Sequence, residues 1–68
     1  MPSWTVTINE LNQRVPAGLP LASGEIFASD EQTALAGALE AARMYGTVAL
    51  VQTDLDMVFV LVDTPPHN

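Results

Sequence analysis

Apolar and polar residues alternate at the start of the chain, and this pattern predicts a strand. Trp4, Val6 and Ile8 alternate with polar residues in the segment WTVTIN, which is the two-residue period of a strand with one buried face. We therefore expect a first strand over residues 3–9. The next segment, LNQRVPAGLPLASG, has two prolines and two glycines in 14 residues and predicts a loop. A second strand is expected after it, in GEIFA.

The strongest pattern in the chain is helical, and it predicts a helix over residues 30–45. Ser29 with Gln32 fits a capping box, and Gly46 is expected to end the helix in the left-handed conformation. The alanines and Gly37 make the helix thin, so we expect it to pack closely on a sheet. Apolar residues form one stripe at helical spacing, which consists of Leu35, Ala38, Leu39, Ala42 and Tyr45.

The last part of the chain predicts a β-hairpin. The runs TVALVQ and MVFVLVD are separated by TDLD, which places Asp54 and Asp56 at the tip. The second run is almost entirely apolar and favours a strand that is central or covered on both faces. Residues 64–68 contain two prolines and are expected to form a flexible tail. The predicted fold class is α+β, in the order ββαββ, with a single helix on a four-stranded, mostly antiparallel sheet.

The length and composition fit residues 1–68 as one small acidic domain. The chain contains no cysteine, so neither disulfides nor thiolate metal sites can stabilise it. Its start has no basic segment followed by a long apolar run, and its longest apolar run, MVFVLV, is far too short to span a bilayer. We therefore expect a soluble, cytoplasmic protein.

The charge of the chain is unusual because cations are missing. Eight acidic residues are opposed only by Arg14 and Arg43, no lysine is present, and the net charge is −6. Direct binding to nucleic acid or to an anionic membrane is disfavoured, since both depend on Lys and Arg. A basic protein is the favoured partner. Arg43 is expected to lie near the helix C-terminus and to pair with Glu40.

Few residues could support catalysis or metal binding. His67 is the only histidine and follows two prolines near the C-terminus, so acid–base and nucleophilic roles would fall to carboxylates, hydroxyls or Tyr45. A Ca²⁺ ion needs about 6–8 oxygen ligands, more than the hairpin TDLD can supply. We expect no enzyme activity, no metal and no cofactor. Aromatic side chains are expected in the core, with Trp4 as a candidate half-exposed anchor for a partner.

The acidic side chains are the candidate partner-binding residues. We expect the hairpin tip at one end of the sheet, and Glu10, Asp63 and the helix N-terminus at the other end or along an edge. One interpretation is a solvated anionic surface that aids solubility. The other is a surface that imitates a phosphate backbone and occupies a basic, nucleic-acid-binding groove of another protein. The candidates are Glu10, Glu25, Asp30, Glu31, Asp54, Asp56 and Asp63.

The segment TALAGALEAARMYGTVALVQTDLDMVFVLV, residues 33–62, resembles small phage-encoded anti-CRISPR proteins. The similarity lies in an Ala/Met-rich helix, an aromatic-glycine stop at Tyr45 and Gly46, and a closing hairpin. The resemblance implies an inhibitor that acts in the bacterial host cell. It would bind a subunit of a CRISPR surveillance complex through an acidic surface, where target DNA enters a positively charged channel. We expect a monomer.

An alternative of a different class is a small protein–protein interaction module. The segment EIFASDEQTALAGALEAARMYG resembles the strand-to-helix part of HicB-like antitoxins, although the proline-glycine motif that precedes it in that family is missing. This alternative implies an antitoxin-like or homodimeric partner protein. It would use an exposed strand edge or the apolar stripe of the helix.

Overall fold

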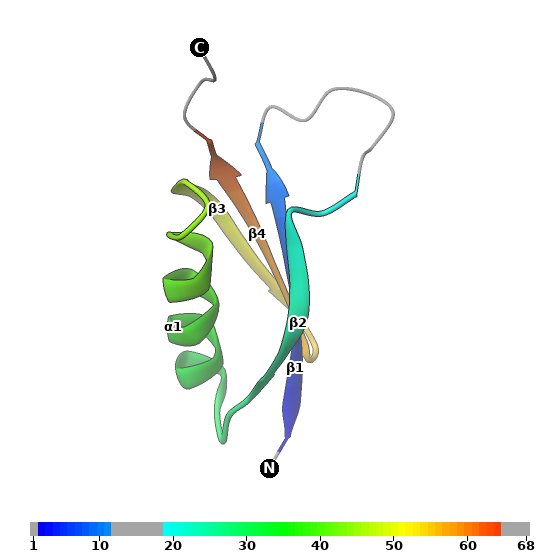
Figure 1. Ribbon diagram of the computed structural model, residues 1–68. Helices are drawn as coiled ribbons and strands as arrows, with labels where there is room; N and C mark the ends of the chain where they lie inside the picture. Colours follow the sequence, from blue (N-terminus) through cyan, green and yellow to red (C-terminus); the bar gives the residue numbers. More distant parts are fainter. Residues whose placement is uncertain (1, 12–18, 65–68) are drawn as a thin grey trace.

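One helix packs on one face of a four-stranded sheet in the computed structural model, which describes residues 2–11 and 19–64 (Figure 1). The elements, in chain order, are β1 (Ser3–Glu10), β2 (Ala22–Phe27), α1 (Glu31–Ala42), β3 (Thr47–Asp54) and β4 (Met57–Asp63). The predicted α+β class and ββαββ order are confirmed. Arg14, His67 and the predicted tail beyond Thr64 lie outside the described residues.

The sheet is mixed, with the strand order β2-β1-β4-β3. The central strands β1 and β4 are parallel, whereas β2 pairs with β1 and β3 pairs with β4 in antiparallel register. The helix connects the two edge strands, because it follows β2 and precedes β3. The central place of β4 agrees with its almost continuous apolar sequence.

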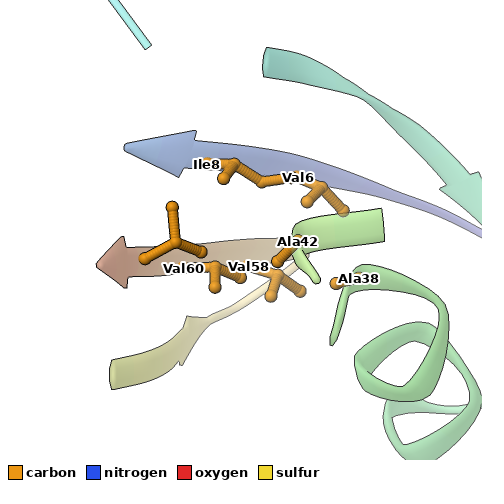
Figure 2. Close-up of a cluster of buried hydrophobic side chains, with 7 residues drawn as sticks. Val6, Ile8, Ala38, Ala42, Val58 and Val60 are labelled. Atoms are coloured by element: carbon orange, nitrogen blue, oxygen red, sulfur yellow. The ribbon is translucent and has the colours of Figure 1, made fainter. Parts of the chain in front are cut away.

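The core consists of small side chains between the helix and the two central strands. Figure 2 shows valines and an isoleucine of β1 and β4 beside two alanines of α1. Gly37 brings the helix close to β2, because a Cβ atom at this position would lie 3.1 Å from Cδ1 of Ile26. The thin helix therefore packs closely on the sheet, as predicted. The buried cluster contains Val6, Ile8, Ala38, Ala42, Val58, Val60 and Val62.

The helix is shorter than the range 30–45 that the sequence predicted. Its N-cap is Asp30, not Ser29, because the Asp30 carboxylate accepts a hydrogen bond of 2.8 Å from the backbone N–H of Thr33. Its C-cap is Arg43, whose backbone N–H donates to the carbonyl groups of Leu39 and Ala41. The capping box that was predicted from Ser29 and Gln32 is therefore wrong by one residue.

The prediction of a left-handed Gly46 is also wrong, since no glycine in the described part of the chain has a positive φ. Gly46 instead allows a close approach of two backbone segments. A Cβ atom at Gly46 would lie 2.5 Å from the carbonyl oxygen of Asp63 and 3.1 Å from Cα of Thr64. The segment after the helix can therefore pass over the end of β4 only without a side chain at this position.

The face of the sheet opposite α1 is not covered by any element of the described residues (Figure 1). Phe59 and Leu61 of β4 lie half-buried on this face, and Leu50 of β3 and Met57 of β4 are exposed. The last strand is therefore central but covered by a helix on one face only. This leaves an apolar surface that no described part of the chain buries.

Candidate protein-binding surface

Four of the seven candidate carboxylates lie at one end of the molecule. Two of them begin the helix, as its N-cap and its first residue, and two flank the tip of the hairpin between β3 and β4. The helix start and the hairpin tip both lie in the lower half of the molecule in Figure 1. We call this surface the acidic end; it consists of Asp30, Glu31, Asp54 and Asp56.

A hydrogen bond joins the two parts of the acidic end. The hydroxyl group of Thr53, near the end of β3, donates to Oε1 of Glu31 in the first turn of α1 at 3.0 Å. The topology explains this contact, because α1 starts where β2 ends and β3 then returns along the sheet to the same end. The prediction that the helix N-terminus lies near Glu10 and Asp63, or along an edge, is therefore wrong.

The carboxylates of the acidic end are exposed and lack a nearby cation. The hydrogen bond from Thr33 holds the pKa of Asp30 below its usual value of 3.8, which favours the charged form. Arg43 is the only arginine in residues 2–11 and 19–64, and it lies at the other end of the helix. Its predicted ion pair with Glu40 is not formed. The negative charge of the acidic end is therefore not neutralised by any side chain that the structure describes.

The other three candidate residues lie elsewhere. Glu10 and Asp63 end β1 and β4 at the opposite end of the sheet, where the hydroxyl group of Thr64 donates to Oε2 of Glu10 at 2.9 Å. Glu25 lies on β2 opposite Thr5 and is exposed. The seven carboxylates thus form one group of four and do not merge into a single patch.

The four carboxylates do not converge on one point. Within the described residues, no three Asp, Glu or His side chains lie close enough together to hold a metal ion. A set of separated charges at one end of a molecule suits contact with a broad basic surface better than contact with one small ion.

Exposed apolar side chains accompany these charges. Leu55 lies at the hairpin tip between Asp54 and Asp56 with 88% of its surface exposed, and its φ of 55° is unusual for leucine. Met57 follows in β4 and is also exposed. Apolar residues rimmed by polar ones are typical of protein-binding surfaces. Leu55 is not among the residues predicted to bind a partner, although its position between two aspartates in TDLD indicates exposure.

The aromatic residues divide between the core and the surface. Trp4 packs half-buried against the core, and its indole N–H is buried without a hydrogen-bond partner in the structure. Phe27 has 66% of its surface exposed, and Tyr45 is also exposed. The expectation that the aromatic side chains lie in the core is therefore wrong for these two, whereas Trp4 is half-buried, as its interpretation as a candidate anchor requires. Phe27 is the last residue of β2, and Tyr45 lines a hollow together with residues of β2.

A hollow of about 230 Å³ lies between the helix and β2. Ala22, Gly24 and Ile26 of β2 line one side, and Ala41, Met44 and Tyr45 line the other. Most of its lining is apolar, and Glu25 is its only charged residue. The hollow therefore offers a place for apolar side chains and no group suited to acid–base chemistry other than Glu25 and Tyr45.

Neither a protein-family model, nor a curated protein, nor a solved structure significantly matches the chain. Across the residues that the structure describes, no helix has both the length and the apolar character needed to cross a membrane.

Proposed function

We propose that this protein is a non-enzymatic inhibitor that places its acidic end in a basic, nucleic-acid-binding groove of another protein. One observation carries the proposal: four separated carboxylates lie at one end of the fold, and Arg43, the only described cation, lies at the other. A groove that binds DNA or RNA is lined by Lys and Arg. Such a groove attracts an acidic surface over a long range. Once the acidic surface is bound, nucleic acid can no longer enter the groove.

The proposed target is a subunit of a CRISPR surveillance complex. The resemblance of residues 33–62 to anti-CRISPR proteins supports this choice. A guide-RNA complex also holds its DNA in a positively charged channel, which is the kind of surface that the acidic end fits. The protein would then act in the cytoplasm of a bacterial host cell, as a DNA mimic that needs no cofactor, no membrane and no direct contact with nucleic acid.

Leu55 and Met57 give this interaction a source of specificity that charge alone lacks. Exposed carboxylates attract many basic proteins, but they discriminate among them poorly because each pair is solvated and screened. An exposed leucine between two aspartates contributes affinity only where the partner has an apolar pocket among its cations. The preferred target is therefore a basic channel with an apolar site at its entrance.

A second candidate function is a protein–protein interaction module of the antitoxin-like or homodimeric kind. The uncovered face of the sheet favours it, because Leu50, Met57 and Phe59 form an apolar surface there. Binding through that face would depend on apolar burial and change little with salt. Salt dependence therefore separates the two candidates.

Capture of target DNA by CRISPR complexes of several types, measured with and without the protein, tests the proposal. The critical variant carries Asp54→Asn and Asp56→Asn. Its matched control carries Glu40→Gln and Asp63→Asn. These two substitutions remove the same amount of charge, but at positions outside the acidic end. We expect the wild-type protein to block DNA capture by at least one type of complex. The critical variant should lose about tenfold or more in affinity, and the control about twofold or less.

Salt gives an independent measurement on the same complex. Wild-type affinity should fall steeply between about 50 mM and about 300 mM NaCl, because the attraction is between solvated charges. An equal loss in the two double variants, or an affinity that does not depend on salt, would contradict a role for the acidic end. Unimpaired DNA capture by every type of complex would exclude a CRISPR target.

A further inference from the structure

The two edges of the sheet differ in how well they are protected against pairing with another strand. The β3 edge carries an irregularity, since its register with β4 shifts between Val48 and Leu50. Bulges, prolines and lysines are the common means by which proteins protect an edge. β2 has none of these: it pairs with β1 in unbroken register, and Glu25 is its only charged residue.

The backbone groups on the outer side of β2 can be assigned from the ladder with β1. The N–H of Ala28 donates to the carbonyl of Pro2 at 3.2 Å, so these two residues face each other in a hydrogen-bonded position. Such positions alternate along an antiparallel pair. The N–H and C=O groups of Ser23, Glu25 and Phe27 therefore point away from β1, and no element of the described chain covers them.

We propose that β2 pairs in antiparallel register with β2 of a second copy of this chain, around a two-fold axis at Gly24. The outward backbone groups of Ser23, Glu25 and Phe27 limit the possible registers. The N–H of Leu21 is not available to a second copy, because it donates to the carbonyl of Ile8 at 2.7 Å. Pairing Glu25 with Glu25 of the second copy would place two like charges opposite each other, which is unfavourable. The register centred on Gly24 avoids this, since Glu25 then faces Ser23 of the second copy.

The same register buries apolar side chains that the single chain leaves exposed. Phe27, with 66% of its surface exposed, then faces Leu21 of the second copy, which is 39% exposed. A Cβ atom built at Gly24 meets nothing within 4 Å, so the axis position is open on the side of the helix. The apolar hollow beside Ala22 and Ile26 also lies next to the axis in each copy. β2 is thus complementary to itself in charge and apolar contacts, and the backbone groups of Ser23 and Glu25 can bond to those of the second copy on both sides of the axis.

Charge alone favours a monomer, but this arrangement keeps the most acidic regions apart. β2 ends at the acidic end, just before Asp30. In an antiparallel pair the second β2 runs in the opposite direction, so the two acidic ends lie at opposite ends of the eight-stranded sheet. The dimer then presents two acidic ends at once and can bind a partner with two sites more tightly than one end alone.

Cysteine cross-linking and sedimentation test this dimer. The natural chain has no cysteine, so a single Gly24→Cys substitution reports on the axis alone. The two Cα atoms would lie about 4.5 Å apart, within the range that a disulfide can bridge. The control is Gln52→Cys on the exposed β3 edge. We expect Gly24→Cys to cross-link about tenfold or more faster than the control, and wild-type protein to sediment as a concentration-dependent dimer.

A third variant, Glu25→Pro, removes an outward N–H without breaking the ladder with β1, and proline is tolerated at such edge positions. It should remain folded by circular dichroism and sediment as a monomer. Equal cross-linking rates for the two cysteine variants, together with a wild-type monomer at about 1 mM, would overturn the proposal. The result is independent of the proposed function: a monomer that blocks DNA capture would refute only the dimer, and a dimer that blocks nothing would refute only the inhibitor.

Discussion

Gly46 lies where the chain leaves the helix and passes the end of β4, and it tolerates no side chain. The Cβ atom of an alanine at this position would lie 2.5 Å from the backbone oxygen of Asp63. Because the obstacle is backbone and not the end of a flexible side chain, β4 or the turn must shift. We predict that Gly46→Ala lowers the free energy of unfolding by about 1–3 kcal/mol, measured by urea denaturation.

The matched control for this prediction is Gly24→Ala, at protein concentrations low enough to keep the chain monomeric. A Cβ atom at Gly24 meets nothing within 4 Å, and the φ of Gly24 is not positive. Alanine in a strand avoids the conformational entropy that glycine loses, so this variant should be stabilised by about 0.5 kcal/mol. If both variants were equally stable, close approach would not be the reason for glycine at position 46.

At the scale of one element, the helix depends on a charged N-cap. The pKa of Asp30 is lowered by its hydrogen bonds with Thr33, so the folded state favours the ionised carboxylate more than the unfolded state does. This contribution is fully present above the unfolded pKa and is lost as the pH falls through the lower, folded pKa. Asp30→Asn keeps the cap but does not titrate. We predict that wild type loses melting temperature relative to Asp30→Asn as the pH is lowered from about 5 to about 2.

Asp54→Asn is the control for this pH dependence, because it removes a charge from the same end of the molecule without affecting the cap. An equal decrease for Asp54→Asn would mean that the effect comes from charge at this end of the molecule and not from the cap. A difference between wild type and Asp30→Asn that stays constant over this range would show that the cap does not need its charge.

The elements also show how far the sequence determines the fold. The alternation in WTVTIN and the apolar run MVFVLVD correctly predicted β1 and β4. Both patterns can be read from the sequence because buried positions of a strand require apolar residues. The helix ends were predicted less well because Ser29 and Asp30 are both good caps, and only the contact with Thr33 decides between them. Gly46 was misassigned because its reason, contact with Asp63, is 17 residues away in the chain.

The composition of the acidic end depends on information that local patterns lack. Periodicity tells which face of a strand is buried, but it does not tell which strand is its neighbour. β1 and β4 are far apart in the sequence but pair in parallel. The helix leads the chain back to the start of β3, and β3 then ends beside Glu31. The seven carboxylates could therefore be listed from the sequence, whereas the division into four and three required the sheet order.

At the scale of the whole molecule, unneutralised charge should make stability depend on salt. The net charge is −6, and no ion pair joins any two residues in the described ranges. Like charges repel more strongly in the compact state than in the unfolded chain, and salt screens this repulsion. We predict that the melting temperature rises between about 10 mM and about 200 mM NaCl, as the screening length falls from about 30 Å to below 10 Å. An unchanged melting temperature would contradict this.

The uneven placement of the charges makes the salt effect depend on which carboxylates are removed. Asp54→Asn with Asp56→Asn leaves only one of the repulsive pairs within the acidic end, that of Asp30 with Glu31. Glu40→Gln with Asp63→Asn removes the same net charge but leaves the acidic end intact. Because repulsion falls with distance, the first double variant should lose more of the salt dependence of the melting temperature than the second. The measurement uses dilute protein, so that dimerisation does not contribute. Equal losses in the two double variants would mean that the salt dependence is set by the total charge and not by its concentration at one end.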